Sequence, residues 1–295
     1  MNKKFQIGRI LIPYDFSETA DLAIAHAVFM AKLHKAEIIL LHVIESFSFA
    51  SAISSAFGKS QSEFESKIKS SAGEKLKELA EKLHHDSGMA VTPRTENGKI
   101  YKKINTVAEE ANCDIIVMGT HGSSGFQEFV VGSNTYKVVM NAPCPVISVQ
   151  AHAKKVGFKN IVFAVDNSQS SRQKVKHAAE IARHYNSVIH IAGLMTMSDV
   201  DLQRRFEVKV HQVRDYFEEH EVAHTVKVFK TENTAATISE FATQVNADLI
   251  MIMTDQEGSG IFMGNAAQQI INHSKIPVMS IRPNEGDGDK ISVGY

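Results

Sequence analysis

The chain has 295 residues, 43% of them hydrophobic and 22% charged, and its 32 basic and 33 acidic side chains give a formal net charge of −1. This balance gives no support for a surface that binds nucleic acid or membranes, and the sequence holds neither a signal peptide nor an apolar run of about 18 residues that could span a bilayer. We therefore expect a cytoplasmic protein. The length predicts two domains, since a domain typically has about 100–200 residues.

The first half of the chain alternates short apolar segments with helical patterns. Expected strands lie near 8–14, 37–44, 90–94, 114–118 and 145–149, and expected helices near 18–35, 61–86, 99–112 and 133–141. The run Ile38-Ile39-Leu40-Leu41 is continuously apolar, which is typical of a parallel sheet covered on both faces. Alternating strands and helices with right-handed crossovers predict a doubly wound α/β domain. Residues 46–60, rich in Ser, Ala and Phe, are predicted to form a loop or lid.

The first strand ends in Asp15, and Ser17 stands just before the first expected helix. Either side chain could cap that helix. Asp15 also lies at the carboxyl end of a central strand, where doubly wound sheets bind their ligands. The sequence allows both uses at once.

A glycine-rich stretch follows the fourth strand, with Gly119, Gly122 and Gly132 and then Ser133 at the start of a helix. Glycines let the backbone approach a phosphate closely, and the amides of a helix N-terminus attract anions. The stretch is neither a Walker A loop nor a G-x-G-x-x-G fingerprint, because no lysine follows and the preceding strand is the fourth. A purely structural turn with a helix cap is the simplest alternative.

His121, Ser123 and Ser124 lie inside this stretch and supply fragments of a catalytic triad, but no nucleophile elbow accompanies them. We predict no catalytic residues. The scattered histidines, among them His34 and His184 near helix ends, predict no metal site. The two cysteines, Cys113 and Cys144, are expected to be reduced and buried.

The second half of the chain repeats the first. The corresponding segments are 9–17 and 160–168, 20–35 and 171–186, 112–118 and 246–252, and 144–149 and 276–281. Its expected strands lie near 160–165, 188–193, 223–230, 248–253 and 277–281. We therefore expect domains at 1–151 and 157–283, a connector at 150–158, and a flexible tail at 284–295.

The spacing Gly-x-x-Gly, nine residues, Gly-Ser resembles the ATP-binding signature of the universal stress protein (UspA) family. The resemblance extends over both halves, so the chain is similar to a tandem member of that family. It implies, for each half, a five-stranded parallel sheet in the order 3-2-1-4-5 with helices on both faces. It also implies that an adenine nucleotide lies between the first and fourth strands, with Mg²⁺ able to bridge its phosphates.

The resemblance implies nine contact residues, carried over by position. Pro13 and Asp15 would contact the adenosine part, and backbone groups of Val43 would meet the adenine edge. The remaining residues are Met118 and Gly119 under the ribose, and Gly122, Gly132, Ser133 and Asn134 around the phosphates.

The second half departs from this pattern. Met253 stands where the first half has Gly119, Asn265 replaces Ser133, and the spacing between the corresponding positions is shorter. Asp255 and Glu257 place negative charge where phosphates would lie, which disfavours binding. We predict that this half does not hold ATP in the usual way, although its remaining glycines leave room for another ligand.

Three functions stay open: an ATP-binding stress-response switch or sensor, an interaction or scaffold protein that needs no nucleotide, and a slow ATPase or nucleotidyl transferase. The absence of basic side chains between Gly119 and Gly132 argues against the transferase. By resemblance, the strands at 145–149 and 277–281 are expected to pair the two halves as a homodimer would pair, and further dimerisation of the whole chain is allowed.

Overall fold

The computed structural model describes residues 5–45, 61–120, 132–168, 170–254 and 265–283. The lid expected at 46–60, the loop residue Gly122 and the tail 284–295 lie outside these residues. None of the helices within the described ranges is long and apolar enough to cross a membrane.

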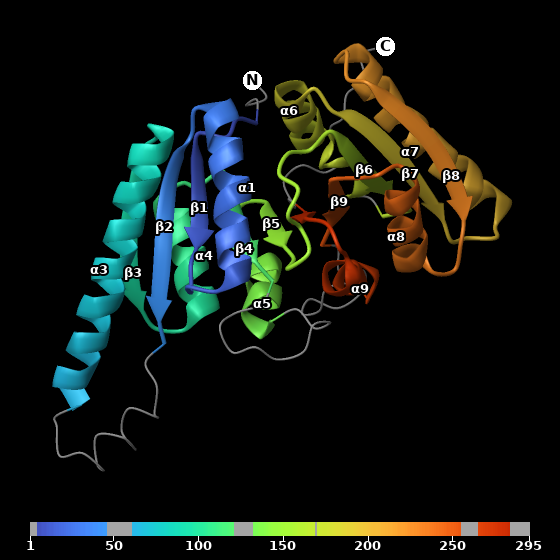
Figure 1. Cartoon of the computed structure of the whole chain (residues 1–295). Helices are drawn as coiled ribbons and strands as arrows, with labels where there is room; N and C mark the ends of the chain where they lie inside the picture. The colour runs from blue at the N-terminus through green and yellow to red at the C-terminus, as the bar shows by residue number, and fades with distance from the viewer. Residues whose placement is uncertain (1–4, 46–60, 121–131, 169, 255–264, 284–295) are drawn as a thin grey trace.

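The described residues of the first half form five strands and four helices in alternating order (Figure 1). Its strands are β1 (Arg9–Pro13), β2 (Glu37–Ile44), β3 (Val91–Asn97), β4 (Ile115–Gly119) and β5 (Val146–Val149). Its helices are α1 (Glu18–His34), α3 (Gln61–Ser87), α4 (Ile100–Glu110) and α5 (Ser133–Asn141). Every strand and helix expected in this half is present, within a few residues of the predicted bounds.

The second half repeats this order. Its strands are β6 (Asn160–Val165), β7 (Val188–Met195), β8 (His224–Lys230), β9 (Leu249–Met253) and β10 (Val278–Ile281). Its helical segments are η1 (Ser170–Arg172), α6 (Val175–Tyr185), α7 (Val200–Glu219), α8 (Thr234–Gln244) and α9 (Asn265–His273). The helix expected from Ser171 therefore begins later, after a short 3₁₀ turn.

The ten strands form one sheet in the order β3-β2-β1-β4-β5-β10-β9-β6-β7-β8. Within each half all neighbours are parallel and follow the expected order 3-2-1-4-5. The halves meet where β5 and β10 pair antiparallel, with Ile147 opposite Met279 and the Ser148 hydroxyl donating to the Val278 carbonyl at 3.2 Å. The last strands thus pair as the resemblance implied.

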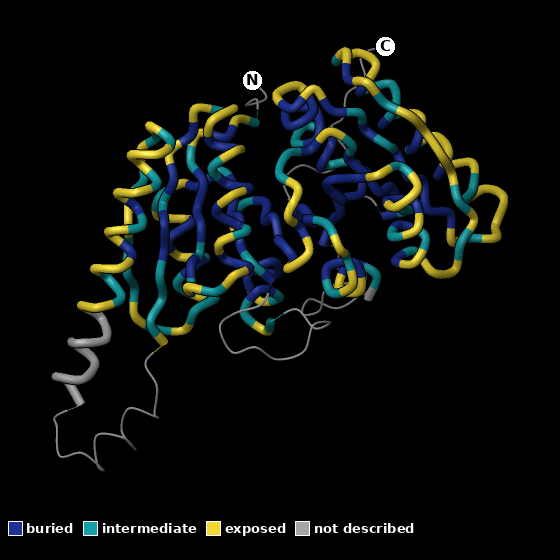
Figure 2. Tube along the Cα trace, viewed as in Figure 1, coloured by how far each residue is buried: buried dark blue, intermediate teal, exposed yellow. Residues whose placement is uncertain are grey.

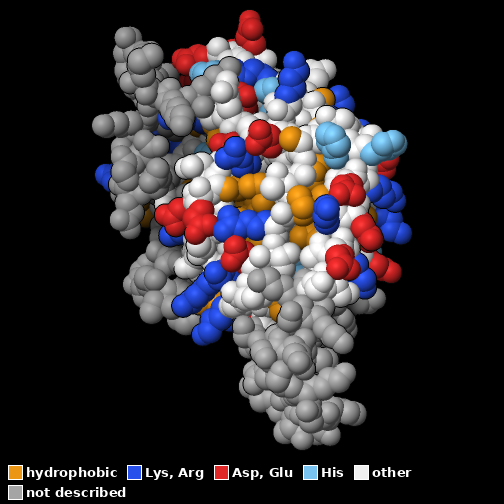
Figure 3. Space-filling model, turned by 90° about the vertical axis from the view of Figure 1, so that its left-hand side faces the viewer, with side chains coloured by type: hydrophobic (Ala, Val, Ile, Leu, Met, Phe, Trp, Pro, Cys, Tyr) orange, Lys and Arg blue, Asp and Glu red, His pale blue; other side chains and the backbone are white. Residues whose placement is uncertain are grey.

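Helices cover both faces of the sheet, as predicted. Residues of α1, α3, α6 and α7 pack in one buried cluster, and residues of α4, α5, α8 and α9 pack in another on the opposite face. Figure 2 shows the strands buried between helices whose outer sides are exposed. On the side that carries α3 and β3, basic and acidic side chains are interspersed (Figure 3).

One repeated motif has a clear structural role. Asp114, just before β4, accepts hydrogen bonds at Oδ2 from the backbone N–H groups of Gly8 and Arg9, at 2.8 and 2.9 Å. Asp248, just before β9, accepts two such bonds from the start of β6, at 2.9 and 3.0 Å. Each carboxylate therefore ties the start of the fourth strand to the start of the first.

We expect Asp114→Asn to lower the free energy of unfolding by about 1 kcal/mol, because the amide oxygen keeps both bonds but loses their charge assistance. Urea denaturation followed by circular dichroism measures this change. Asp86→Asn, at a side chain that is 58% exposed, is the matched control and should have no effect. Equal stability of the two variants would contradict the proposed tie.

The two cysteines are free thiols, as expected. Cys113 is buried, and burial raises the pKa of its thiol to about 11. Cys144 is only partly buried, which differs from the prediction, yet desolvation raises its pKa as well. Both thiols are therefore protonated at neutral pH and make poor nucleophiles.

Candidate functional site

A cavity of about 490 Å³ opens at the carboxyl ends of β1, β2 and β4, beside the start of α5. Its lining combines two kinds of group. Apolar side chains come from Leu41, Val43, Ile100, Ile104 and Met118, and polar groups or free backbone come from Asp15, Gly119, Thr120, Gly132, Ser133 and Asn134. A cavity with both kinds of lining suits a ligand that has a flat ring system and a charged group.

Eight of the nine residues expected at a nucleotide site line this one cavity. They are Pro13, Asp15, Val43, Met118, Gly119, Gly132, Ser133 and Asn134. The ninth, Gly122, lies outside the described residues. The structure therefore brings together residues from four separate segments of the chain.

Asp15 has a structural role at the rim of the cavity. Its Oδ1 accepts hydrogen bonds from the hydroxyl of Ser17 at 2.6 Å and from the backbone N–H of Ser17 at 3.2 Å. Ser17 is the N-cap of α1, and its hydroxyl oxygen accepts from the backbone N–H of Ala20. Ser17 therefore caps α1, and Asp15 lines the cavity at the same time, so the two uses that the sequence allowed are compatible.

The start of α5 lines the cavity. The N–H of Gly132 donates to the Thr120 carbonyl at 2.9 Å, so it is not one of the amides that face a ligand. The first helical hydrogen bond runs from Tyr136 N–H to the Gly132 carbonyl. The amides of residues 133–135 therefore have no partner within the helix, and the positive end of its dipole adds to them.

A glycine at position 119 is required by packing as well as by the expected close approach of its backbone to a phosphate. A Cβ atom at this position would lie 2.7 Å from Oγ1 and 2.9 Å from the carbonyl carbon of Thr19, in the first turn of α1. Real Cβ atoms essentially never come so close. The residue must be glycine for α1 to begin where it does.

Sequence reasoning missed several residues of the cavity. Ile100 and Ile104, on one face of α4, complete the apolar part, and their spacing of four residues is the signal that could have found them. Tyr14 and His42 also line the cavity. The Tyr14 hydroxyl donates to Asp21 at 2.7 Å, and burial together with this bond raises its pKa.

The corresponding position in the second half is built differently. The cavity there measures about 100 Å³ and is lined by Asp166 and Met253 among others. Met253, at the place of Gly119, is 7% exposed and joins the core under α6 and α7. Asp166 repeats the hydrogen bond that Asp15 makes in the first half, since its Oδ1 accepts from the Ser168 hydroxyl at 2.6 Å.

The start of α6 differs from the start of α1. Ser170 corresponds to Thr19, because each stands four residues after the aspartate of its half. This segment forms the 3₁₀ turn η1 against β9, the strand that ends at Met253, and the α-helix begins only at Val175. Asp255 and Glu257, whose charges were expected to disfavour phosphate in this half, lie outside the described residues.

Comparisons with known proteins agree with this duplicated architecture. A model of the universal stress protein family matches residues 6–150 and again residues 157–282. Universal stress protein MJ0577 of Methanocaldococcus jannaschii is 34% identical over 153 residues, which cover 48% of this chain and 94% of that protein. That relative therefore corresponds in length to about one half of the chain.

Two solved structures share the fold over almost the whole chain. A universal stress protein from Archaeoglobus fulgidus has a TM-score of 0.73 at 20% identity and covers 97% of this chain and 100% of its own. A putative universal stress protein from Pseudomonas aeruginosa has a TM-score of 0.67 at 18% identity and covers 96% of this chain and 95% of its own.

Proposed function

The chain belongs to the universal stress protein family, and we propose that its N-terminal half binds ATP and uses it as a switch or sensor in a stress response. The nucleotide would lie in the cavity at the ends of β1, β2 and β4. Its binding would link the start of α5 to the ends of these strands, and so change a surface that a partner protein recognises.

The observation that carries this proposal is the pairing of an apolar pocket with a helix N-terminus. Ile100, Ile104 and Met118 offer an apolar surface for a base, and residues 133–135, which line the same cavity, offer backbone amides for phosphates. Helix N-termini bind phosphates through these amides and the helix dipole. The volume of about 490 Å³ is within the usual range for small-molecule sites, about 300–1,000 Å³.

The residues present also fit a bound Mg²⁺ ion. Mg²⁺ prefers oxygen ligands and usually combines one or two protein oxygens with phosphates and water. Asp15 and Ser133 line the cavity, and their side chains carry oxygen atoms. Such an ion would neutralise phosphate charge, a task for which the described lining residues include no lysine or arginine.

The same lack of basic side chains favours binding over turnover. Phosphoryl and nucleotidyl transfer depend on groups that stabilise the charge of the transition state. We therefore propose that ATP hydrolysis, where it occurs, is slow and incidental.

The second half is proposed to remain empty of ATP. Its cavity of about 100 Å³ is below the usual size of a nucleotide pocket, and the side chain of Met253, at the place of Gly119, is part of its lining. We expect one nucleotide per chain.

The sharpest test is Ser133→Glu. A carboxylate at the first position of α5 favours the helix by about 0.3–1 kcal/mol, so the fold should be kept, while its charge repels phosphate. At ATP concentrations near 100 times Kd, the wild type should gain about 2.7 kcal/mol of stability, and the variant should gain almost none. Thermal unfolding with and without ATP and Mg²⁺ measures this gain.

Asn265→Glu is the matched control, since Asn265 is the first residue of the corresponding helix α9. It should leave the stabilisation by ATP unchanged. Mass spectrometry of molecules released from the purified chain should find about one ATP or ADP per chain. No released nucleotide and no thermal shift in the wild type would instead support a scaffold that works without nucleotide.

A further inference from the structure

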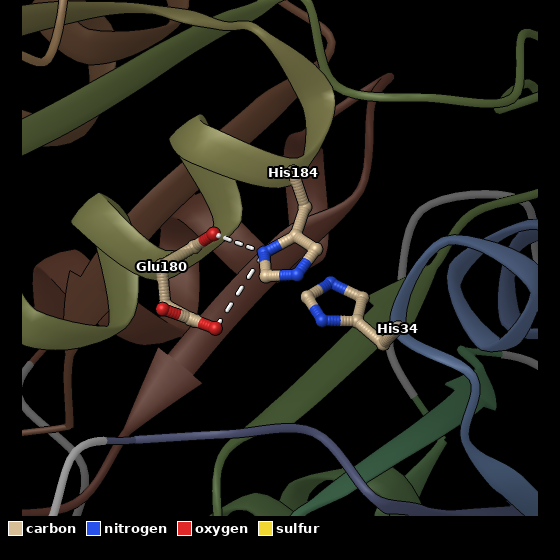
Figure 4. Close-up of side chains that lie close together, drawn as sticks. All are labelled: His34, Glu180 and His184. Carbon is tan, nitrogen blue, oxygen red and sulfur yellow. Dashed lines mark hydrogen bonds and ion pairs between the residues drawn. The ribbon is translucent and has the colours of Figure 1, made fainter.

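Three potential metal ligands meet where the two halves of the chain touch. His34 is the last residue of α1, in the first half, whereas Glu180 and His184 lie one turn apart on α6, in the second half (Figure 4). One ligand atom from each residue can be chosen so that all three lie within 4.8 Å of one another. Neither helix could form this group alone.

The two histidine rings face each other with their planes nearly parallel. Their centroids are 4.0 Å apart and the angle between the planes is 30°. Nε2 of His34 is buried and has no hydrogen-bond partner among the described residues. A buried polar atom without a partner normally lowers the stability of the fold by about 1–3 kcal/mol, and a ligand bound to this atom would remove that cost.

His184 is oriented as a metal-binding histidine would be. Its Nδ1 lies 3.0 Å from the backbone carbonyl of Glu180, and a carbonyl can only accept, so Nδ1 carries the proton. The lone pair is therefore on Nε2. Histidines that bind metals commonly donate their other N–H to a backbone carbonyl in this way.

Glu180 divides its two oxygens between two tasks. Oε2 accepts a hydrogen bond from Arg183 at 3.1 Å, and Oε1 lies 3.5 Å from Nδ1 of His184. The side chain is only 4% exposed. Arg183 can thus hold the carboxylate in place while Oε1 remains on the side of the histidines.

The electrostatic surroundings favour a cation. The carboxyl-terminal ends of α1 and α6 both lie at this point, and each contributes partial negative charge.

We propose that His34 Nε2, Glu180 Oε1 and His184 Nε2 bind a divalent transition-metal ion, with Zn²⁺ as the best fit, and that the ion clamps the two halves together. Two imidazoles and one carboxylate, with the fourth position left to water, are a common ligand set for Zn²⁺. Ligand atoms around a tetrahedral Zn²⁺ are about 3.3 Å apart, given bond lengths of about 2.0–2.1 Å. The ligand atoms of the three residues lie within 4.8 Å of one another, so side-chain movements that shorten these distances by up to about 1.5 Å would reach that geometry.

The site was not predicted because its parts are far apart in the sequence. The spacing of Glu180 and His184, four residues on one helix face, is a signal that sequence reasoning could have used. The third ligand depends on how α1 and α6 meet, which is a property of the folded chain.

The full-length chain, stripped with a chelator, tests this proposal by titration with Zn²⁺ against a chromophoric competitor. One tight site per chain is expected, and Co²⁺ should give the intense visible bands of tetrahedral coordination. His34→Phe keeps the ring stacking but removes both nitrogens, and Glu180→Gln removes the charge. Each should weaken binding at least about 100-fold, beyond the 10–100-fold effect of losing a supporting group.

The matched control is His84→Asn with His85→Asn, a histidine pair at the end of α3. It should keep the tight site, and Zn²⁺ should raise the melting temperature of the control but not of His34→Phe. Circular dichroism of the metal-free proteins checks that each variant is folded. Unchanged affinity in both His34→Phe and Glu180→Gln, or loss of the tight site in the control, would overturn the proposal.

Discussion

Replacement of Phe158 by alanine is expected to lower the free energy of unfolding by about 3–5 kcal/mol, the usual effect of removing a buried aromatic ring. Phe158 is 1% exposed. Its ring stacks on His26 of α1, with centroids 5.9 Å apart, and packs against Tyr185 of α6 at 5.0 Å. One side chain therefore packs against both halves of the chain, and its loss should loosen their contact.

The connector before Phe158 gives a way to measure that loosening. His26 also holds the connector, because its Nε2 lies 3.0 Å from the Ala153 carbonyl. Trypsin can cleave after Lys154 and Lys155, and cleavage should become faster in the Phe158→Ala variant. Phe163→Ala is the matched control, because the Phe163 ring packs against Phe217 within the second half. It should lose similar stability without faster cleavage there, and equal cleavage rates would refute the role given to Phe158.

The second large effect is expected at Gly119. Gly119→Ala should destabilise the chain by about 1–3 kcal/mol, and Gly119→Met by about 3 kcal/mol or more, because the new Cβ meets the backbone of Thr19. The start of α1 would have to move, and the second half, which has Met253 at this place, has a 3₁₀ turn before α6. Loss of ATP binding in these variants would therefore report on the fold as well as on the site, so Ser133→Glu is the cleaner test of binding.

Gly73→Ala is the control for this prediction. Gly73 lies inside α3, and an added Cβ would come no closer than 3.9 Å to Thr95. Alanine should stabilise the helix there by about 0.5–1 kcal/mol, since it restricts the unfolded chain. Urea denaturation of the two alanine variants should give shifts of opposite sign. A neutral Gly119→Ala would show that α1 can adjust at little cost.

Much of the fold could be predicted because local patterns and long-range pairing agree. Continuous apolar runs such as residues 38–41 marked parallel strands, and the repeated segments showed that one topology serves twice. The start of α6 could not be placed in the same way. Nothing in the local pattern from Ser171 reveals that a 3₁₀ turn forms here, against the strand β9 from far along the chain.

The residues of the candidate site can also be divided into those that the sequence could predict and those that it could not. Residues that follow strands, such as Asp15 and Gly119, could be predicted to converge because the carboxyl ends of parallel strands share one edge of the sheet. The hydrogen bond from Gly132 to Thr120 and the apolar contribution of Ile100 could not, because they depend on how a loop closes and how a helix is turned. The ATP-binding role of these residues remains our prediction.

The antiparallel pairing of β5 with β10 has a consequence for dilution. Two separate chains joined at such an edge dissociate once their concentration falls below the dissociation constant of the pair. Here the partners are joined through residues 150–159, and a short linker holds them at an effective concentration of about millimolar. The midpoint of unfolding should therefore not depend on protein concentration, and the ten-stranded sheet should persist however scarce the protein is.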